Sequence, residues 1–263
     1  MNETSLIICF IINIVVCFGI PLGALVYLVA TKKKAEKSFF VGICIFLIFQ
    51  VFFRMPLLQY VLSKMDWYNI MNSTSPIAYG LFLGLTAGLF EEVGRFLGFK
   101  IFLKKNLRWI DGFAFGIGHG GIEAMLLVGT SFIQRLIILI SLNNGTFDPV
   151  KIGVSEESVR ASFLVTTNIM VLIGGLERIF ALTAHVGFTL IVLYGIKKGK
   201  LIYLGLAILV HAIVDSTVAI FPKIFGIGII GIEVFIGISA IMFFIYIIKS
   251  RKFFRILEGV NIK

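Results

Sequence analysis

The segment 77–103, IAYGLFLGLTAGLFEEVGRFLGFKIFL, contains a pair of glutamates and an arginine within a mainly apolar stretch. It is longer than the about 20 apolar residues that a helix needs to cross a hydrocarbon core about 30 Å thick. Charged side chains are costly to bury in hydrocarbon, and in membrane helices they mark functional sites by default. The segment therefore predicts a membrane-spanning helix that carries Glu91, Glu92 and Arg95 as part of a site.

The composition extends this interpretation to the whole chain. Of its 263 residues, 59% are hydrophobic and only 14% are charged, and the mean hydropathy is +1.03. These values exclude an ordinary soluble globular domain. No long linker or block of charge sets off a soluble part, so we predict a single integral membrane domain over 1–263. Cys9, Cys17 and Cys44 show no Cys-x-x-Cys spacing, which indicates neither a disulfide framework nor a thiolate metal site.

Seven stretches are apolar and long enough to cross a membrane, which predicts an all-α, polytopic bundle of about seven transmembrane helices. Their predicted limits are 5–30, 38–54, 77–103, 109–129, 170–196, 201–222 and 225–248. The apolar segment 131–142 is too short to span the membrane alone, and we interpret it as an extension of the fourth helix or an interfacial segment. A polar loop from Asn143 to Arg160 is expected after it.

The basic residues gather after every second predicted helix. Sixteen of the 24 lysines and arginines follow the first, third, fifth and seventh helices: Lys32, Lys33, Lys34, Lys37, Lys100, Lys104, Lys105, Arg108, Lys197, Lys198, Lys200, Lys249, Arg251, Lys252, Arg255 and Lys263. Because cytoplasmic loops are enriched in basic residues, we expect the N-terminus outside and the C-terminus in the cytoplasm. The formal charge of +10 then reflects topology and attraction to anionic lipid, and no nucleic-acid partner is indicated.

Four ionisable residues share one predicted depth in the membrane. Measured from the basic side, Glu92, His119, His185 and His211 each lie ten or eleven residues into their helices, or on the order of 15 Å deep. Polar residues with separate local roles have no reason to coincide in depth on four helices. We therefore predict that these side chains meet in one buried site.

The spacing of small residues predicts which faces are packed. Gly80, Gly84 and Gly88 recur every four residues and lead to Glu92. Residues four apart lie on one side of a helix, and such rows of small residues allow membrane helices to approach closely. Glu92 is thus expected on a packed face. On the same helix, Glu91 and Arg95 are spaced for an ion pair, which predicts an orienting role for Arg95.

The chemistry available to these residues includes metal binding. A catalytic zinc site uses three protein ligands and leaves a position for water. The three imidazoles meet that number, so we predict a divalent metal site, with zinc as the expected ion, formed by His119, His185 and His211. Glu91 or Glu92 could then serve as the general base. Asp215 and Glu123, each four residues after a histidine, are predicted to be ligands or partners that orient the rings.

Several motifs resemble those of a known superfamily. Glu91-Glu92-x-x-Arg95, Phe115-x-x-x-His119 and His211-x-x-x-Asp215 resemble, in their order, motifs of the CAAX prenyl protease and bacteriocin-processing superfamily. The narrower resemblance is to the YhfC family of intramembrane metalloproteases, with the PrsW proteases as similar relatives. It is carried by Glu91-Glu92-Val-Gly-Arg95-Phe96, Gly118-His119-Gly120-Gly121-x-Glu123, and Glu177-Arg178 with His185. The resemblance covers about residues 77–222.

The resemblance implies peptide-bond hydrolysis in or beside a bacterial cytoplasmic membrane, on a membrane-embedded or lipidated protein or peptide. It implies that Glu91 and Glu92 activate water with help from His119, while His211 and Asp215 stabilise the oxyanion or bind metal. The prenyl-protease branch also allows a metal-free mechanism that depends on glutamate, whereas the additional His185 favours a metal. Glu177 and Arg178 would orient the site or form a structural ion pair about 12 Å outward of His185.

Two other classes of function use similar residues. A proton-coupled transporter also buries glutamate, histidine and arginine at mid-membrane, but it should show internal repeats, and none is evident in the sequence. A noncatalytic membrane binding protein could keep the same fold. The presence of every motif residue favours an enzyme.

Overall fold

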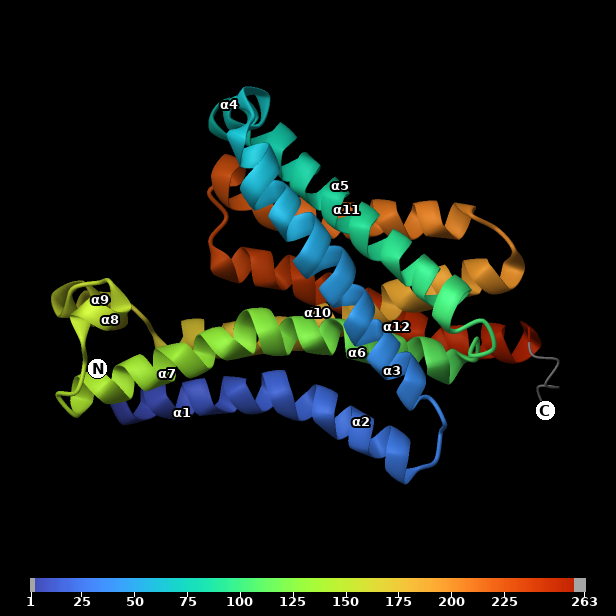
Figure 1. The fold of residues 1–263 in the computed structure, drawn as a ribbon, viewed down its shortest axis with the longest axis horizontal. Coiled ribbons are helices and arrows are strands. Elements are labelled where there is room, and N and C mark those ends of the chain that lie inside the picture. Colours follow the sequence, from blue (N-terminus) through green and yellow to red (C-terminus); the bar gives the residue numbers. More distant parts are fainter. Residues whose placement is uncertain (1–2, 258–263) are drawn as a thin grey trace.

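The computed structural model describes residues 3–257, which form helices and short connections without a β-strand (Figure 1). Seven continuous helical stretches are long and apolar enough to cross a membrane, as predicted. They run over Thr4–Ala30, Glu36–Lys64, Pro76–Phe102, Trp109–Asn143, Asn168–Lys198, Ile202–Phe225 and Ile229–Leu257. The chain is therefore an all-α integral membrane protein.

The first four spans are composite, because π-helical segments interrupt or end the regular α-helix, and a 3₁₀ turn, η4, ends the second span. Their elements are α1 Glu3–Ile14, η1 Val15–Gly19 and α2 Ile20–Ala30; α3 Glu36–Phe46, η2 Leu47–Arg54, η3 Leu57–Val61 and η4 Leu62–Lys64; α5 Pro76–Leu97 and η5 Gly98–Phe102; and α6 Trp109–Glu123, η6 Ala124–Gly129 and α7 Thr130–Asn143. The other elements are α4 Asp66–Thr74, α8 Pro149–Ile152, α9 Glu156–Leu164, α10 Asn168–Lys198, α11 Ile202–Phe225 and α12 Ile229–Leu257. Turns of the π type are frequent at functional sites, and η6 begins directly after Glu123.

The structure corrects several predicted limits. The second span continues to Lys64 instead of ending at residue 54, and the fourth continues to Asn143, so the segment 131–142 extends the fourth helix. Two short helices, α8 and α9, replace half of the expected polar loop. The last span ends at Leu257 instead of residue 248. For the last span, hydropathy detects only the part of the helix that crosses hydrocarbon, whereas the lysines and arginines after residue 248 are good helix formers and allow the helix to continue.

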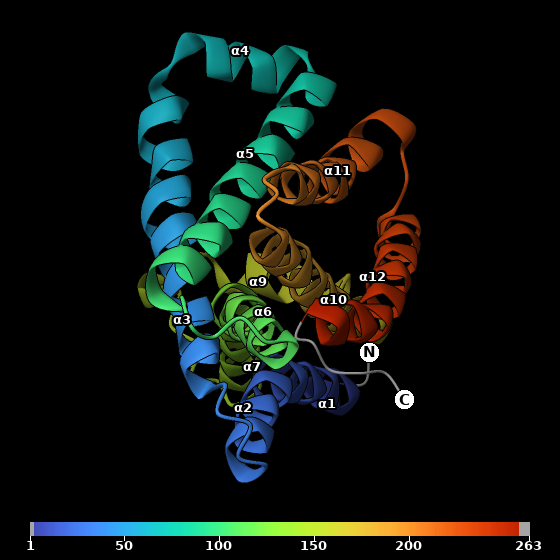
Figure 2. The ribbon, with the colours of Figure 1, turned by 90° about the vertical axis from the view of Figure 1, so that its right-hand side faces the viewer.

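Two spans cross the others steeply. In Figure 1, α3 and α5 rise towards α4 at the top, whereas α1, α7 and α10 follow the long axis of the molecule. Figure 2 shows α5 beside α11, with α10 below them. The connections that follow the first, third and fifth spans lie at the same end of the molecule as the end of α12. The basic segments therefore share one side, as predicted, and the assignment of that side to the cytoplasm stays a prediction.

Glycines bring the site-bearing helices into close contact. A Cβ atom added at any glycine of the predicted row on α5 would meet an atom of α11 within 3 Å; these glycines are Gly80, Gly84 and Gly88. On α6, a Cβ at Gly116 would lie 2.6 Å from Cα of Val186 on α10. Such approaches require small residues. The packed face predicted for α5 is thus confirmed, and it faces the helix that carries His211.

We expect Gly88→Ala to destabilise the bundle, because the new Cβ would lie 2.6 Å from the carbonyl oxygen of Ile208, a backbone atom that cannot turn aside. Overpacking of this kind costs about 1–3 kcal/mol, which should appear as a lower melting temperature in detergent. Gly205→Ala is the matched control, since no neighbouring atom lies within 4 Å of a Cβ there. Equal melting temperatures for the two variants would contradict the close contact between α5 and α11.

Candidate active site

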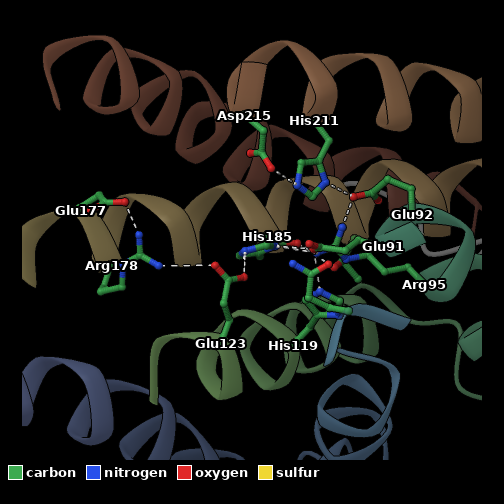
Figure 3. Close-up of polar contacts among 12 residues, drawn as sticks. Glu91, Glu92, Arg95, His119, Glu123, Glu177, Arg178, His185, His211 and Asp215 are labelled. Atoms are coloured by element: carbon green, nitrogen blue, oxygen red, sulfur yellow. Dashed lines mark hydrogen bonds and ion pairs between the residues drawn. The ribbon is translucent and has the colours of Figure 1, made fainter. Parts of the chain in front are cut away.

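The ionisable residues predicted on four helices meet in one cluster (Figure 3). Glu91 and Glu92 come from α5, His119 from α6, His185 from α10 and His211 from α11. All five are buried. The ring centroids of His119 and His185 are 5.3 Å apart, and those of His185 and His211 are 5.9 Å apart. The predicted convergence of these four helices is therefore confirmed.

Glu91 is the carboxylate at the centre of this cluster. Its Oε2 lies 3.0 Å from Nε2 of His119 and 3.8 Å from Nδ1 of His185. Nη2 of Arg95, one turn further along α5, lies 3.3 Å from the same oxygen, so the ion pair predicted from the spacing is present. One carboxylate oxygen thus faces two imidazoles and a guanidinium.

Arg95 and Glu123 hold the ring of His185 from two sides. Nη2 of Arg95 donates to Nδ1 of His185 at 2.6 Å, and Nδ1 must accept because a guanidinium has no acceptor. The other nitrogen, Nε2, then carries the proton and lies 2.6 Å from Oε2 of Glu123. This second contact is close but not aligned as a hydrogen bond. The two contacts together set the tautomer and the orientation of the ring.

Glu92 has a different set of contacts. Its Oε1 accepts from the guanidinium of Arg95 and, at 2.7 Å, from Nδ1 of His211. Nε2 of His211 then faces Asp215, whose Oδ2 lies 3.6 Å away, which is beyond hydrogen-bonding distance. The ring of Phe188 stacks on the imidazole of His211, with 4.5 Å between the centroids. Glu92 and Phe188 therefore fix His211 and leave its Nε2 available.

Glu177 and Arg178 are connected to the cluster through Glu123. Arg178 forms an ion pair with Glu177, and its Nη1 lies 3.4 Å from Oε1 of Glu123. Because the other oxygen of Glu123 contacts His185, polar contacts continue from this pair to the histidines (Figure 3). The ion pair predicted on α10 is present and joins the site.

A cavity of about 330 Å³ opens between α5, α10, α11, α12, η2 and the end of α6. Its polar wall includes residues of the cluster and of the ion pair beside it: Glu91, Glu123, Glu177, Arg178, His185, His211 and Asp215. Glu92 does not line it. The two neighbouring glutamates therefore differ, since only Glu91 faces the space in which a small molecule or a peptide could lie.

Glu91, His119 and His185 are placed to share a metal ion. One donor atom of each lies within 4.8 Å of the others, and a carboxylate oxygen with two imidazole nitrogens is a known donor set of catalytic zinc. His119 also has a buried Nδ1 without a hydrogen-bond partner. His211 is outside this group; its Nδ1 donates to Glu92, and its Nε2 faces Asp215. Of the three histidines predicted to bind metal, the structure places His119 and His185 in the donor group, with Glu91 as the third donor.

Three residues beside the cluster were not predicted from the sequence. They are Phe188; Phe46, whose ring edge meets His119 at a centroid distance of 5.2 Å; and Arg54, which lines the cavity and donates to the carbonyl oxygen of Leu83 at 2.8 Å. The phenylalanines carry no signal, because the chain contains 27 of them. Arg54 could have been identified by the rule that singled out Arg95, since it is an arginine inside an apolar span.

Comparisons with known proteins agree with the motif resemblance. The family described as YhfC intramembrane metalloprotease matches residues 15–238, which include the whole cluster. A Bacillus subtilis protein described as the uncharacterized membrane protein YhfC is 30% identical over 251 residues, covering 91% of this chain and 94% of that protein. No solved structure matches the chain significantly.

Proposed function

Because the chain belongs to the YhfC intramembrane metalloprotease family, we propose that it hydrolyses a peptide bond in or beside the membrane. The observation that carries this proposal is the position of Glu91, which contacts two histidines and lines a cavity between spanning helices. A carboxylate and imidazoles around such a cavity can activate water. The expected substrate is a membrane-embedded or lipidated protein or peptide.

We assign a divalent metal ion, with zinc as the expected one, to Glu91, His119 and His185. The donor set fits zinc, and Glu123 contacts the ring nitrogen of His185 opposite the one that would bind it, as the partners of metal-bound histidines do. Binding requires Arg95 to release Nδ1 of His185, with which it makes a 2.6 Å contact. When bound, such an ion supplies Lewis-acid polarisation of a carbonyl group and activation of water.

His211 and Asp215 are proposed to act on the substrate carbonyl oxygen. Glu92 holds Nδ1 of His211 and lies outside the cavity, so it positions the ring instead of contacting substrate. His211 and Asp215 both line the cavity. Because Nδ1 of His211 donates to Glu92, Nε2 can donate to a substrate oxygen only when the ring is protonated, and the carboxylate of Asp215, 3.6 Å from Nε2, favours that charge. A donor aimed at a developing oxyanion stabilises the transition state.

The metal-free mechanism keeps one supporting observation. Arg95 occupies Nδ1 of His185 at 2.6 Å, which leaves Glu91 with His119 as its nearest imidazole. In that mechanism Oε2 of Glu91 takes the proton from water and His119 orients the carboxylate. Glu91 is thus a metal ligand in one mechanism and the base that takes the proton from water in the other, and the two differ in whether the purified protein contains stoichiometric metal.

We expect the purified protein to contain about one zinc ion per chain, and His119→Ala and His185→Ala to lose it. His211→Ala is the matched control: it should keep the zinc and lose peptide hydrolysis, because His211 contacts Glu92 and not the donor group. Elemental analysis of the four proteins, prepared without a histidine tag, measures this. Metal-free wild-type protein that cleaves substrate in the presence of a chelator would instead establish the glutamate mechanism.

We also propose that the protein lies in a bacterial cytoplasmic membrane with its basic end in the cytoplasm. The similar protein from Bacillus subtilis is described as a membrane protein, and the basic connections share one end of the bundle. Cytoplasmic segments next to membrane helices carry this excess of lysine and arginine.

A further inference from the structure

A second cavity lies at the basic end of the bundle, far from the histidines. It is a groove of about 470 Å³ between the end of α2, the start of α6 and the end of α12. Four of its lining residues are cations: Lys33, Arg108, Arg251 and Arg255. None of the residues that line it is acidic. The groove therefore has the charge to bind an anion.

The aromatic wall of the groove holds one of these cations in place. The guanidinium of Arg251 lies over the indole of Trp109, 4.3 Å from the ring centroid. The indole stacks on Phe113 with centroids 5.3 Å apart, and its Nε1 donates to Oγ of Ser250 at 2.8 Å. A guanidinium stacked on its face keeps the N–H groups at its edge available to a ligand.

The cations are not neutralised to the same extent. Arg108 forms an ion pair with Asp111 at 2.8 Å. Among the described side chains of residues 4–257, no carboxylate lies within 4.0 Å of the charged groups of Lys33, Arg251 or Arg255. Three positive charges around one groove are thus left without a carboxylate partner in the described part of the chain.

The turn that carries Lys33 is tied to the groove. Lys32 and Lys34 have φ angles of 51° and 55°, a left-handed conformation that is uncommon for residues other than glycine. Nη2 of Arg108 donates to the carbonyl oxygen of Lys34 at 2.8 Å. This contact joins the turn to the start of α6 and keeps Lys33 beside the arginines.

The position of the groove suits a ligand with a polar head and an apolar tail. The 29 residues of α12 extend about 43 Å, which exceeds a hydrocarbon core of about 30 Å and places its basic end at headgroup level. Tryptophan is typical of this level. The wall of the groove also contains Ile110, Phe113 and Phe254, against which an acyl chain can pack.

From these observations we infer that the groove binds an anionic phospholipid. Its phosphate contacts Arg251, Arg255 and Lys33, and an acyl chain lies along Trp109 and Phe113. Basic pockets between membrane helices recognise acidic headgroups in this way, and guanidinium groups match phosphate oxygens in bidentate geometry. The site does not depend on the proposed protease activity. It differs from general attraction to an acidic membrane because it assigns binding to particular residues.

The test compares two double variants with the same change in charge. Arg251→Gln/Arg255→Gln removes two cations of the groove, whereas Lys104→Gln/Lys105→Gln removes two exposed cations at the same end that do not line it. Phosphatidylglycerol or phosphatidylcholine with identical acyl chains is added to each purified protein in detergent. Bound lipid is counted by native mass spectrometry, and the melting temperature is recorded with and without lipid.

The wild type and the lysine variant should retain phosphatidylglycerol and gain thermal stability from it, and phosphatidylcholine should have a much smaller effect. The arginine variant should bind phosphatidylglycerol on the order of tenfold or more weakly. If both double variants lose phosphatidylglycerol binding equally, the binding is general electrostatic attraction, and the proposed site is wrong. Equal stabilisation by inorganic phosphate would also overturn it, since the acyl chain would then contribute nothing. A melting temperature without lipid close to that of the wild type shows that each variant is folded.

Discussion

Replacing Glu91 with glutamine is expected to lower kcat/KM for peptide hydrolysis by about 10³-fold. Glutamine has nearly the same shape, but it carries no charge to hold a metal ion and cannot accept the proton of water. General base catalysis contributes about 10²–10⁴-fold, and Oε2 of Glu91 faces His119 at 3.0 Å at the edge of the cavity. The effect is expected under both mechanisms, so it tests the site itself.

The measurement needs a substrate, which can be found by comparing new peptide termini in bacterial membranes incubated with wild-type or Glu91→Gln protein. Kinetics then follow on a peptide that contains the identified bond. Glu157→Gln is the matched control, because Glu157 lies exposed on α9, outside the cavity. Cleavage of that bond by Glu91→Gln at more than a tenth of the wild-type rate would remove Glu91 from the chemistry.

Replacing Arg95 with methionine should destabilise the folded protein by about 3–5 kcal/mol. Arg95 is fully buried and contacts both Glu91 and Glu92. Without it, two neighbouring carboxylates remain in the bundle without their cation. Breaking one partner of a buried ion pair is costly because the remaining charge has lost its solvation and its counterion. The free energy of unfolding in a denaturing-detergent titration measures the loss.

A control and a second mutation make this result specific. Arg160→Met removes an arginine that pairs with Glu156 at 2.8 Å, also four residues earlier, on the exposed helix α9, and it should cost at most about 1 kcal/mol. Adding Glu92→Gln to Arg95→Met should recover part of the loss, because one unpaired charge is removed. Equal stability of Arg95→Met and Arg160→Met would contradict the role of Arg95 in neutralising the two glutamates.

The cluster was predictable because membrane burial restricts where charges can be placed. In a soluble protein, isolated histidines and glutamates say little about function. In an apolar span each of them is costly to bury, so its presence indicates a functional or structural role. The basic connections mark the same membrane surface on each helix. Counting residues from that surface gave Glu92, His119, His185 and His211 the same depth. The glycine row then predicted the face that α5 turns to its neighbour, and the structure places α11 there.

The partners within the cluster could not be predicted, because neighbouring residues on a helix point in directions that differ by about 100°. That difference decides that Glu91 lines the cavity while Glu92 does not. The rotation of each helix about its axis, which the sequence does not specify, also decides which side chains meet. It brings His211 to Glu92, and the metal donor group is then Glu91, His119 and His185. The extension of the second span from residue 55 to Lys64 was missed because Pro56 and polar residues interrupt its apolar pattern.

The cavity wall beside Glu91 restricts the form in which a membrane segment can present a peptide bond. In an α-helix each backbone carbonyl is hydrogen-bonded along the helix axis and surrounded by side chains. A transmembrane segment satisfies its backbone hydrogen bonds within its own helix, so it must unwind locally before the peptide bond can enter. Residues that break helices, such as glycine or proline near the scissile bond, should therefore make a membrane segment a better substrate.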